Sequence, residues 1–320
     1  MAEPGKYSNS SAWADIQPIE QDDGPNALAT ISYSDGYREC MSYLRGCMAT
    51  NDLSPRVLEL TEDVINMNPA HYTVWLYRAK VLFANDSDLH NELAWLEPMS
   101  LKFQKNYQIW HHRQQVVERI GSCEGETAFI EKMFELDAKN YHVWSYRQWL
   151  VKRFGLWDKG ELEDMDKLLD KDVRNNSAWN HRWYVVFGRP DTEKVFADRE
   201  VVQRELEYAQ EKIRLAPQNQ SPWNYIRGLS RKATGNASLP LSSLKEFASE
   251  FASVEEPDKI KSSHALDLLA DAYAEEGKKV EASKSLDLLA TKYDPIRANY
   301  WNWRKSKLNG ETGTSVQTSA

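Results

Sequence analysis

Apolar residues recur along the chain at helical spacing, three or four positions apart, and rarely alternate as they would in strands. The first clear case follows Ser54 and Pro55, a pair suited to an N-cap and a first helical turn, and comprises Val57, Leu60, Val64 and Ile65. Further segments of this kind are 127–137, 161–172 and 199–216. Because strand-like runs bounded by hairpin signals are nearly absent, the pattern predicts an all-α fold.

One phrase that ends in W-x-x-R follows these helical segments. It reads HYTVWLYR at 71–78, NYQIWHHR at 106–113, NYHVWSYR at 140–147 and NNSAWNHR at 175–182. Its tryptophans are 34 or 35 residues apart. Looser copies contain Trp223 and Trp301, with a degenerate unit predicted between them at 265–277. This period predicts a solenoid of helical hairpins with a concave inner surface.

The tryptophan and the arginine three positions later lie on one face of a helix. Such a tryptophan can fill the layer between helices, and the guanidinium can stack on a ring or pair with an acidic neighbour. We therefore assign these positions to architecture rather than to chemistry. The residues so assigned are Trp75, Trp110, Arg113, Trp144, Arg147, Trp179, Arg182, Trp223 and Trp301.

Polar and cationic residues precede the tryptophan in the first three phrases, at the predicted start of each second helix. They read PAHY at 69–72, KNYQ at 105–108 and KNYH at 139–142. Stacked hairpins would bring these N-termini together, where free N–H groups and the helix dipole attract anions. With Lys105 and Lys139 they could form a diphosphate or carboxylate site. Alternatively, Asn106 and Asn140 are N-caps and the tyrosines pack between repeats.

Composition narrows the class of protein. The 320 residues carry 40 Lys and Arg against 48 Asp and Glu, so no basic surplus indicates nucleic acid or an anionic membrane as a partner. Three cysteines without a C-x-x-C pair, and no apolar core of a signal peptide, favour a reducing, cytoplasmic location. No apolar run is long enough to span a bilayer. No zinc pattern, Walker loop or nucleophile elbow is present, so no metal ligands are predicted.

These phrases resemble the alpha-subunit repeat of protein prenyltransferases, from about Trp13 to Leu308. The stretch WADIQPIEQDDGPNALATISYSDGYREC at 13–40 resembles the start of the farnesyltransferase and geranylgeranyltransferase type I alpha subunits. The stretches KNYQIWHHR, DAKNYHVWSYRQWL and EDMDKLLDKDVRNNSAWNHR are similar to the repeats of that family. The resemblance implies a right-handed α-α superhelix, a crescent-shaped solenoid of helical hairpins. We expect one domain over 13–308, with disordered tails at 1–12 and 309–320.

The function implied by the resemblance is that of the alpha subunit of a heterodimeric CaaX protein prenyltransferase, a transferase active only as the heterodimer. It would transfer farnesyl from its diphosphate, or geranylgeranyl with another beta subunit, to the cysteine thiol of a C-terminal CaaX motif. The resemblance implies that an obligate beta subunit holds the catalytic zinc, which keeps the thiol as thiolate, and that magnesium accompanies the diphosphate. The implied partners are this beta subunit, farnesyl or geranylgeranyl diphosphate, and CaaX-terminated proteins.

The resemblance also implies roles for single residues. Lys105 matches the diphosphate-contacting lysine of the family and is the predicted catalytic residue. Gln108 matches the glutamine that binds the terminal carboxylate of the peptide. The other predicted substrate-binding residues line the diphosphate and peptide side or the pocket for the last CaaX residue; they are Tyr107, Asn140, Tyr141, His142, Ala70 and Tyr72. His71 replaces the asparagine that is common in the family, and its effect on this pocket is left open.

Two other interpretations share part of the pattern. A non-catalytic tetratricopeptide scaffold has hairpins of similar length, but its residues recur at offsets that are not matched here. The alpha subunit of the Rab geranylgeranyltransferase shares the repeat, but the segment 13–40 and the lysine of K-N-Y-Q disfavour it. The sequence leaves open which beta subunit, and therefore which lipid, is used.

Overall fold

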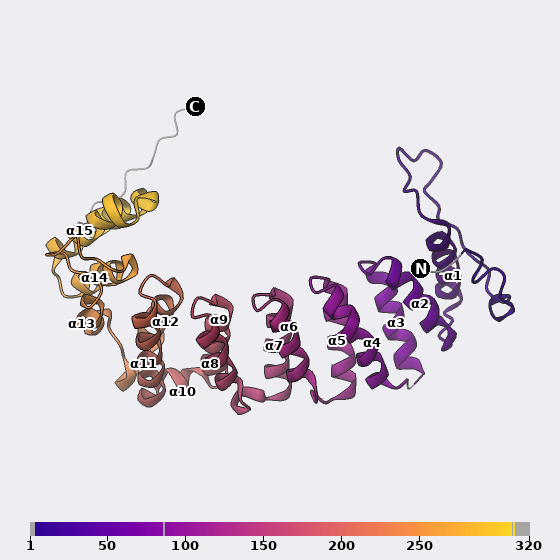
Figure 1. Ribbon diagram of the computed structural model, residues 1–320, viewed down its shortest axis with the longest axis horizontal. Coiled ribbons are helices and arrows are strands. Elements are labelled where there is room, and N and C mark those ends of the chain that lie inside the picture. Colours follow the sequence, from indigo (N-terminus) through magenta and orange to yellow (C-terminus); the bar gives the residue numbers. More distant parts are fainter. Residues whose placement is uncertain (1–3, 86, 309, 311–320) are drawn as a thin grey trace. The chain divides into compact units, whose positions relative to one another are not determined.

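The computed structural model describes residues 4–85, 87–308 and 310. These residues contain sixteen α-helices and no strand, which confirms the predicted all-α fold (Figure 1). They divide into two compact units, Met1–Phe154 and Gly155–Ala320. No helix in the described part of the chain is long and apolar enough to cross a membrane.

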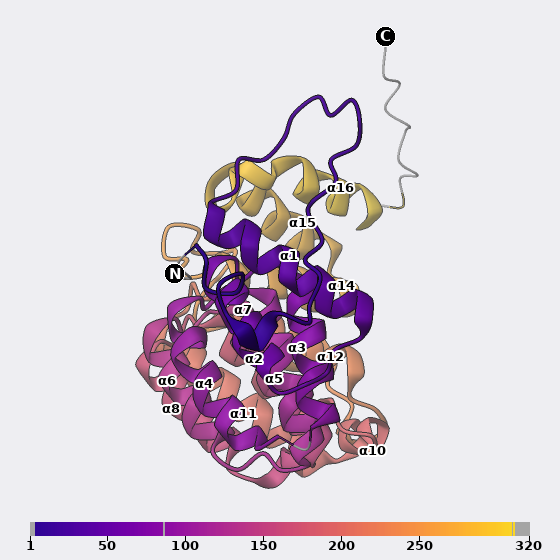
Figure 2. The same ribbon diagram turned by 90° about the vertical axis from the view of Figure 1, so that its right-hand side faces the viewer.

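The first unit consists of one leading helix and three helical hairpins. Its helices are α1 (Asp35–Thr50), α2 (Arg56–Met67), α3 (Tyr72–Ala84), α4 (Leu89–Lys102), α5 (Tyr107–Ile120), α6 (Glu126–Leu136) and α7 (Tyr141–Phe154). Helices pack in the pairs α2–α3, α4–α5 and α6–α7, and α5 packs between the other two second helices, α3 and α7. Figure 2 shows this row from its α1 end. The predicted helical hairpins are therefore confirmed.

The second unit continues the hairpin pattern with shorter helices inserted. Its helices are α8 (Glu161–Lys171), α9 (Asn176–Phe187), α10 (Thr192–Ala197), α11 (Arg199–Leu215), α12 (Gln220–Lys232), α13 (Lys245–Ser249), α14 (Ser263–Glu275), α15 (Lys279–Leu288) and α16 (Ala298–Leu308). The contacting pairs include α8–α9, α11–α12, α14–α15 and α15–α16. The degenerate unit predicted at 265–277 lies largely in α14.

Each repeat tryptophan ties its helix to the turn before it. The indole N–H of Trp75 donates to the carbonyl of Pro69, six residues earlier, at 2.8 Å. The same bond, at 2.9–3.0 Å, recurs as Trp110–Gln104, Trp144–Ala138, Trp179–Val173 and Trp223–Pro217. All these side chains are at most 6% exposed. The indole rings are buried and each indole N–H has a hydrogen-bond acceptor, which supports the assignment of these tryptophans to architecture.

The repeat arginines join neighbouring hairpins through buried carboxylates. Arg78 of α3 donates to both oxygens of Glu92 in α4 at 2.7 Å, and Nε2 of His112 in α5 donates to the same carboxylate at 2.8 Å. Burial alone would raise the pKa of Glu92, but the hydrogen bonds from His112 and Arg78 outweigh it and the pKa lies below its usual value. The arrangement recurs as Arg113–Glu126–Tyr146 and Arg182–Glu205–Tyr225.

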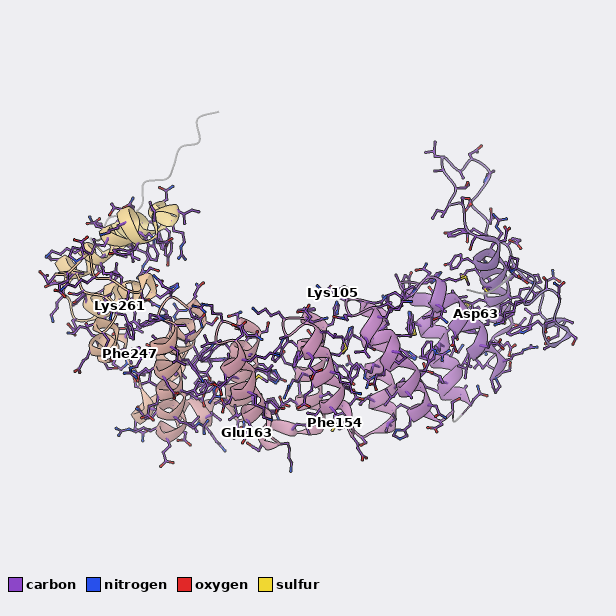
Figure 3. The ribbon with its side chains drawn as sticks, viewed as in Figure 1. Asp63, Lys105, Phe154, Glu163, Phe247 and Lys261 are labelled. Carbon is purple, nitrogen blue, oxygen red and sulfur yellow. The ribbon has the colours of Figure 1, made fainter. Side chains whose placement is uncertain are left out.

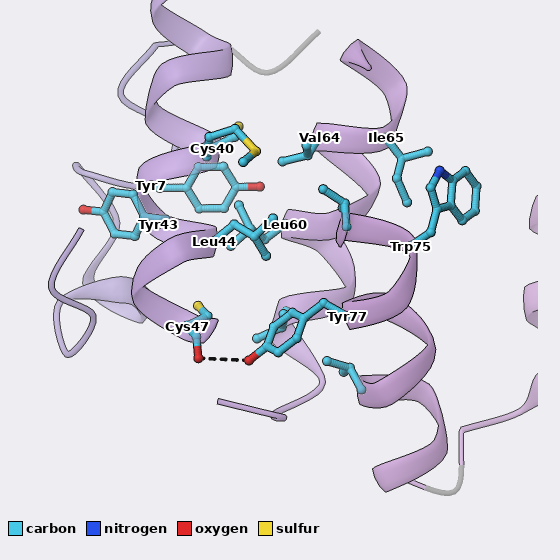
Figure 4. Packing of buried hydrophobic residues seen from close by; sticks show 14 of the residues in the cluster. Tyr7, Cys40, Tyr43, Leu44, Cys47, Leu60, Val64, Ile65, Trp75 and Tyr77 are labelled. Atoms are coloured by element: carbon cyan, nitrogen blue, oxygen red, sulfur yellow. Dashed lines mark hydrogen bonds between the residues drawn. The ribbon is translucent and has the colours of Figure 1, made fainter. Parts of the chain in front are cut away.

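The N-terminal segment covers the outer end of the first hairpin. Tyr7 is buried, and its hydroxyl donates to Asp63 of α2 at 2.6 Å. The carboxylate of Glu39 in α1 accepts the backbone N–H groups of Gly5, Tyr7 and Ser8 at 2.5–3.1 Å. Figure 4 shows Tyr7 packed against Leu44 and Leu60 in the core of this unit.

The predicted tails have different outcomes. Residues 4–12 were expected to be disordered, yet Gly5, Tyr7 and Ser8 make the contacts just described. The remainder of both tails, 1–3, 309 and 311–320, lies outside the described residues. The limits of a single domain at 13 and 308 stay a prediction.

Replacing Trp144 by alanine tests the structural role of the repeat tryptophan. Its ring lies 4.4 Å from that of Phe134, between centroids, so truncation leaves a cavity in the hairpin. We expect Trp144→Ala to lower the free energy of unfolding by about 3–5 kcal/mol, measured by denaturant titration of the purified protein. The control is Trp303→Ala, since Trp303 is 53% exposed and its loss leaves no cavity. Equal stability of the two variants would contradict the assignment.

Candidate functional site

Three turns of the first unit carry the residues predicted to bind substrate. They are 69–72 before α3, 105–108 before α5 and 139–142 before α7, and Figure 3 labels Lys105 at this end of the hairpins. Each second helix begins with a largely exposed tyrosine, and these are Tyr72, Tyr107 and Tyr141. Because α5 packs against both α3 and α7, the three turns are neighbours. The three tyrosine side chains are 63–69% exposed, and one of them, Tyr107, also contacts the next repeat through the ring of His142.

The two asparagines in these turns are N-caps that also bridge hairpins. Asn106 Oδ1 accepts from the N–H groups of Gln108 and Ile109 at 2.9 and 3.2 Å, and its Nδ2 donates to the carbonyl of Pro69 at 2.9 Å. Asn140 Oδ1 accepts from the N–H of His142 at 2.9 Å, while its Nδ2 donates to the carbonyl of Gln104 at 3.1 Å. The carbonyls they reach are the ones that already accept a tryptophan N–H.

The side-chain amide of Asn140 is fully used in hydrogen bonds within the protein. Its side chain is 2% exposed, and both ends of its amide take part in the bonds described above. Its part in a site is therefore to fix the N-terminus of α7, where Tyr141 and His142 begin the helix. Direct contact between Asn140 and a substrate stays a prediction.

Lys105 is the cation at the middle turn. Its side chain is 78% exposed, and Nζ lies 3.6 Å from Oδ2 of Asp137, which belongs to the next turn along the row. Residues 102–106 line a shallow hollow at this place. An exposed ammonium beside helix N-termini is chemically suited to a diphosphate or a carboxylate.

An aromatic contact joins the middle and third turns. The rings of Tyr107 and His142 meet edge to face, with 4.4 Å between centroids. Partial burial lowers the pKa of His142 below its ordinary value, so the imidazole is neutral at pH 7 and offers a hydrogen bond rather than a charge. Gln108, which follows Tyr107 in α5, is half-buried. The predicted residues Lys105, Tyr107 and His142 thus come from adjacent turns.

The first turn contributes a different surface. Ala70 and Tyr72 are exposed, whereas His71, which lies between them, is half-buried and its Nδ1 has no hydrogen-bond partner within the described residues. The ring of His71 lies 6.4 Å from that of Tyr72. His71 therefore belongs to the base of this turn, and Ala70 and Tyr72 to its rim.

Two kinds of residue that shape this region escaped the sequence reasoning. The first is the buried glutamate found in several hairpins, which had a signal, because Glu92, Glu126 and Glu205 all stand 18 residues before their repeat tryptophan. The second is Asp137, which gave no signal because its contact with Lys105 crosses between hairpins. Within the described residues, no three His, Cys, Asp or Glu side chains are placed to hold a metal ion.

A family model and individual relatives identify the same protein family. The model of the protein prenyltransferase alpha subunit repeat matches residues 54–85, 89–120, 123–154, 158–188 and 202–233. The protein farnesyltransferase/geranylgeranyltransferase type-1 subunit alpha of Candida albicans is 37% identical over 305 residues, which cover 92% of this chain and 97% of that protein. Its Schizosaccharomyces pombe counterpart is 53% identical over 218 residues, which cover 68% and 72%.

A solved structure agrees in fold as well as in sequence. The Candida albicans protein geranylgeranyltransferase-I complexed with GGPP matches with a TM-score of 0.84 and 36% identity, covering 92% of this chain and 98% of that one. By contrast, the geranylgeranyl transferase type-2 subunit alpha of Dictyostelium discoideum is 33% identical over 78 residues, which cover 22% of this chain and 25% of that protein.

Removing the cap at α7 tests the structural role of Asn140. We expect Asn140→Ala to lower the free energy of unfolding by about 1–3 kcal/mol, because it removes an N-cap and a hydrogen bond between hairpins. The control is Asn180→Ala, an exposed asparagine inside α9. Thermal or denaturant unfolding of the purified variants is the measurement, and an Asn140→Ala variant as stable as the control would contradict the assignment.

Proposed function

The chain belongs to the protein prenyltransferase alpha-subunit family, and from this membership we propose that it is the alpha subunit of a CaaX protein prenyltransferase. The enzyme is a heterodimer of the farnesyltransferase and geranylgeranyltransferase type I class. It transfers farnesyl, or geranylgeranyl with another beta subunit, from the diphosphate to the cysteine thiol of a C-terminal CaaX motif. The observation that carries the proposal is similarity to type-1 alpha subunits over nearly the whole chain.

The two alternatives are not favoured. The type-2 alpha subunits of Dictyostelium discoideum and Candida albicans match only 22% and 25% of this chain. A non-catalytic tetratricopeptide scaffold would not match the prenyltransferase repeat model at five places. The chain therefore fits the type-1 class better than either.

An exposed aromatic surface supports a permanent partner. Tyr72, Tyr107 and Tyr141 are 63–69% exposed at the starts of neighbouring helices, and Leu76 is half exposed one turn into α3. Apolar surface of this kind on one side of a folded unit is typical of protein interfaces, which are enriched in aromatic residues. We propose that this surface contacts the beta subunit and the bound substrates.

The metal ions implied by the resemblance are assigned outside this chain. The described residues offer no cluster of His, Cys, Asp or Glu for zinc, so zinc does not fit here and is proposed to lie in the beta subunit. Magnesium is proposed to accompany the diphosphate. The free thiols of Cys40, Cys47 and Cys123 support a reducing, cytoplasmic location.

Lys105 is proposed to act on the leaving diphosphate. Negative charge accumulates on the diphosphate as the bond between carbon and oxygen breaks, so an adjacent ammonium stabilises the transition state more than the ground state. Tyr107, Tyr141 and His142 add hydrogen-bonding groups on the diphosphate and peptide side. Gln108 is proposed to bind the terminal carboxylate of the peptide, while Ala70 and Tyr72 border the pocket for its last residue.

Assembly and substrate choice can be tested together. Co-expressed with a beta subunit, the chain should form a heterodimer that buries about 2,000 Å² or more and prenylates a CaaX peptide, but not an escort-bound Rab protein. Analytical ultracentrifugation and transfer of a labelled prenyl group are the measurements. A stable, monodisperse monomer that melts like the complex would contradict an obligate partner, and a preference for Rab would indicate the type-2 class.

Substitution of Lys105 tests its chemical role. Lys105→Ala should leave the heterodimer and its zinc intact and change diphosphate affinity only modestly. It should lower the single-turnover rate roughly 10²-fold, or about 2.7 kcal/mol, because the charge is used mainly in the transition state. Lys139→Ala is the control, since Lys139 occupies the same place one hairpin later without an assigned catalytic role. Similar rates for the two variants would refute the assignment.

A further inference from the structure

The exposed lysine of the middle turn contacts one fixed carboxylate. Lys105 reaches Asp137 across the boundary between two hairpins, with 3.6 Å between Nζ and Oδ2. The lysine side chain is 78% exposed, so little packing restricts its four-carbon stem. A free lysine of this kind samples many rotamers, and few of them direct the ammonium to one point. A contact that restricts the Lys105 side chain therefore determines where its ammonium group lies.

Asp137, by contrast, is held in place by its own turn. Its backbone N–H donates to the carbonyl of Met133 at 3.0 Å, and its carbonyl accepts from the N–H of Asn140 at 3.1 Å. Its Oδ1 accepts from the N–H of Lys139 at 3.0 Å. Two of these bonds hold the backbone of Asp137 and the third orients its carboxylate, so Oδ2 is directed to Lys105 from a defined position.

From this geometry we infer that Asp137 is a positioning residue for Lys105 in prenyl transfer. The inference rests on the proposed function. An ammonium group has three N–H donors, so Lys105 can remain paired with the carboxylate of Asp137 while its N–H groups donate to the diphosphate. The carboxylate restricts the lysine side chain before the substrate binds. The ammonium is therefore already in position when negative charge develops on the diphosphate.

The ion pair between Lys105 and Asp137 contributes little to the stability of the fold. Ion pairs between exposed side chains stabilise folded proteins only weakly, because water screens them and both side chains lose freedom. The hairpins concerned are already joined by the buried contact Arg113–Glu126. An effect of Asp137 should therefore be visible in turnover rather than in stability.

The substitution Asp137→Asn separates charge from structure. Asparagine keeps the size and the oxygen that accepts from Lys139, so the turn is retained while the charge facing Lys105 is removed. In the purified heterodimer we expect the single-turnover rate to fall about 3- to 10-fold, with the dissociation constant of the prenyl diphosphate and the melting temperature nearly unchanged. In a Lys105→Ala background, the same substitution should cause no further fall.

The matched control lies one hairpin later. Asp172 forms the same turn, with Oδ1 accepting from the N–H of Arg174 at 2.9 Å. Asp172→Asn should leave the single-turnover rate unchanged, because no catalytic lysine is assigned to its neighbourhood. A rate loss of equal size in both variants would show that the turn, rather than the contact with Lys105, is responsible, and would overturn the inference.

Two further results would also overturn it. A fall caused by Asp137→Asn that persists in the Lys105→Ala background would mean that Asp137 acts independently of the lysine. Faster turnover or tighter diphosphate binding would mean that Asp137 competes with the diphosphate as a counter-ion. Transfer by the wild-type heterodimer, measured in the same assay, tests the proposed function separately, so a wild-type rate in Asp137→Asn counts against this inference alone.

Discussion

A buried carboxylate shared by neighbouring hairpins is the constraint on which the rest of the structure depends. Glu92 lies in an apolar layer and remains charged because Arg78 of one hairpin and His112 of its own hairpin both donate to it. Taking away one partner would leave an ionised group unpaired in the interior, which is costly. The geometry of these bonds therefore sets the spacing between hairpins, and with it the spacing of the turns that carry the candidate site.

Each buried glutamate also accepts a hydrogen bond from a neutral side chain, in addition to the bonds from its arginine. Burial lowers the pKa of His112 despite its hydrogen bond to Glu92, and burial together with the charge of Glu126 raises the pKa of Tyr146. His112, Tyr146 and Tyr225 each supply one hydrogen bond to the carboxylate without adding a second positive charge. The net charge of each buried cluster thus stays near zero, which low-dielectric surroundings require.

The turns combine rigidity with exposure. One carbonyl in each turn accepts a tryptophan N–H from its own hairpin, and those of Pro69 and Gln104 also accept an asparagine amide from the next. This double use holds the backbone in place while Lys105, Tyr107 and Tyr141 remain at the surface. Residues that hold the turns in place and residues proposed to bind substrate therefore lie next to each other in the same four-residue segments. A substitution in one group need not disturb the other.

The sequence by itself determined the helical period, the hairpin length and the architectural role of the tryptophans, because all three depend on residues close together along one chain. It also identified Lys105, Tyr107 and His142 as candidates from their place before the tryptophan. Only the tertiary structure decided that Asn140 is buried as a cap, that Tyr7 belongs to the core, and that Asp137 contacts Lys105. These contacts join segments 32 to 56 residues apart, so they depend on how separate helices pack, which no local pattern specifies.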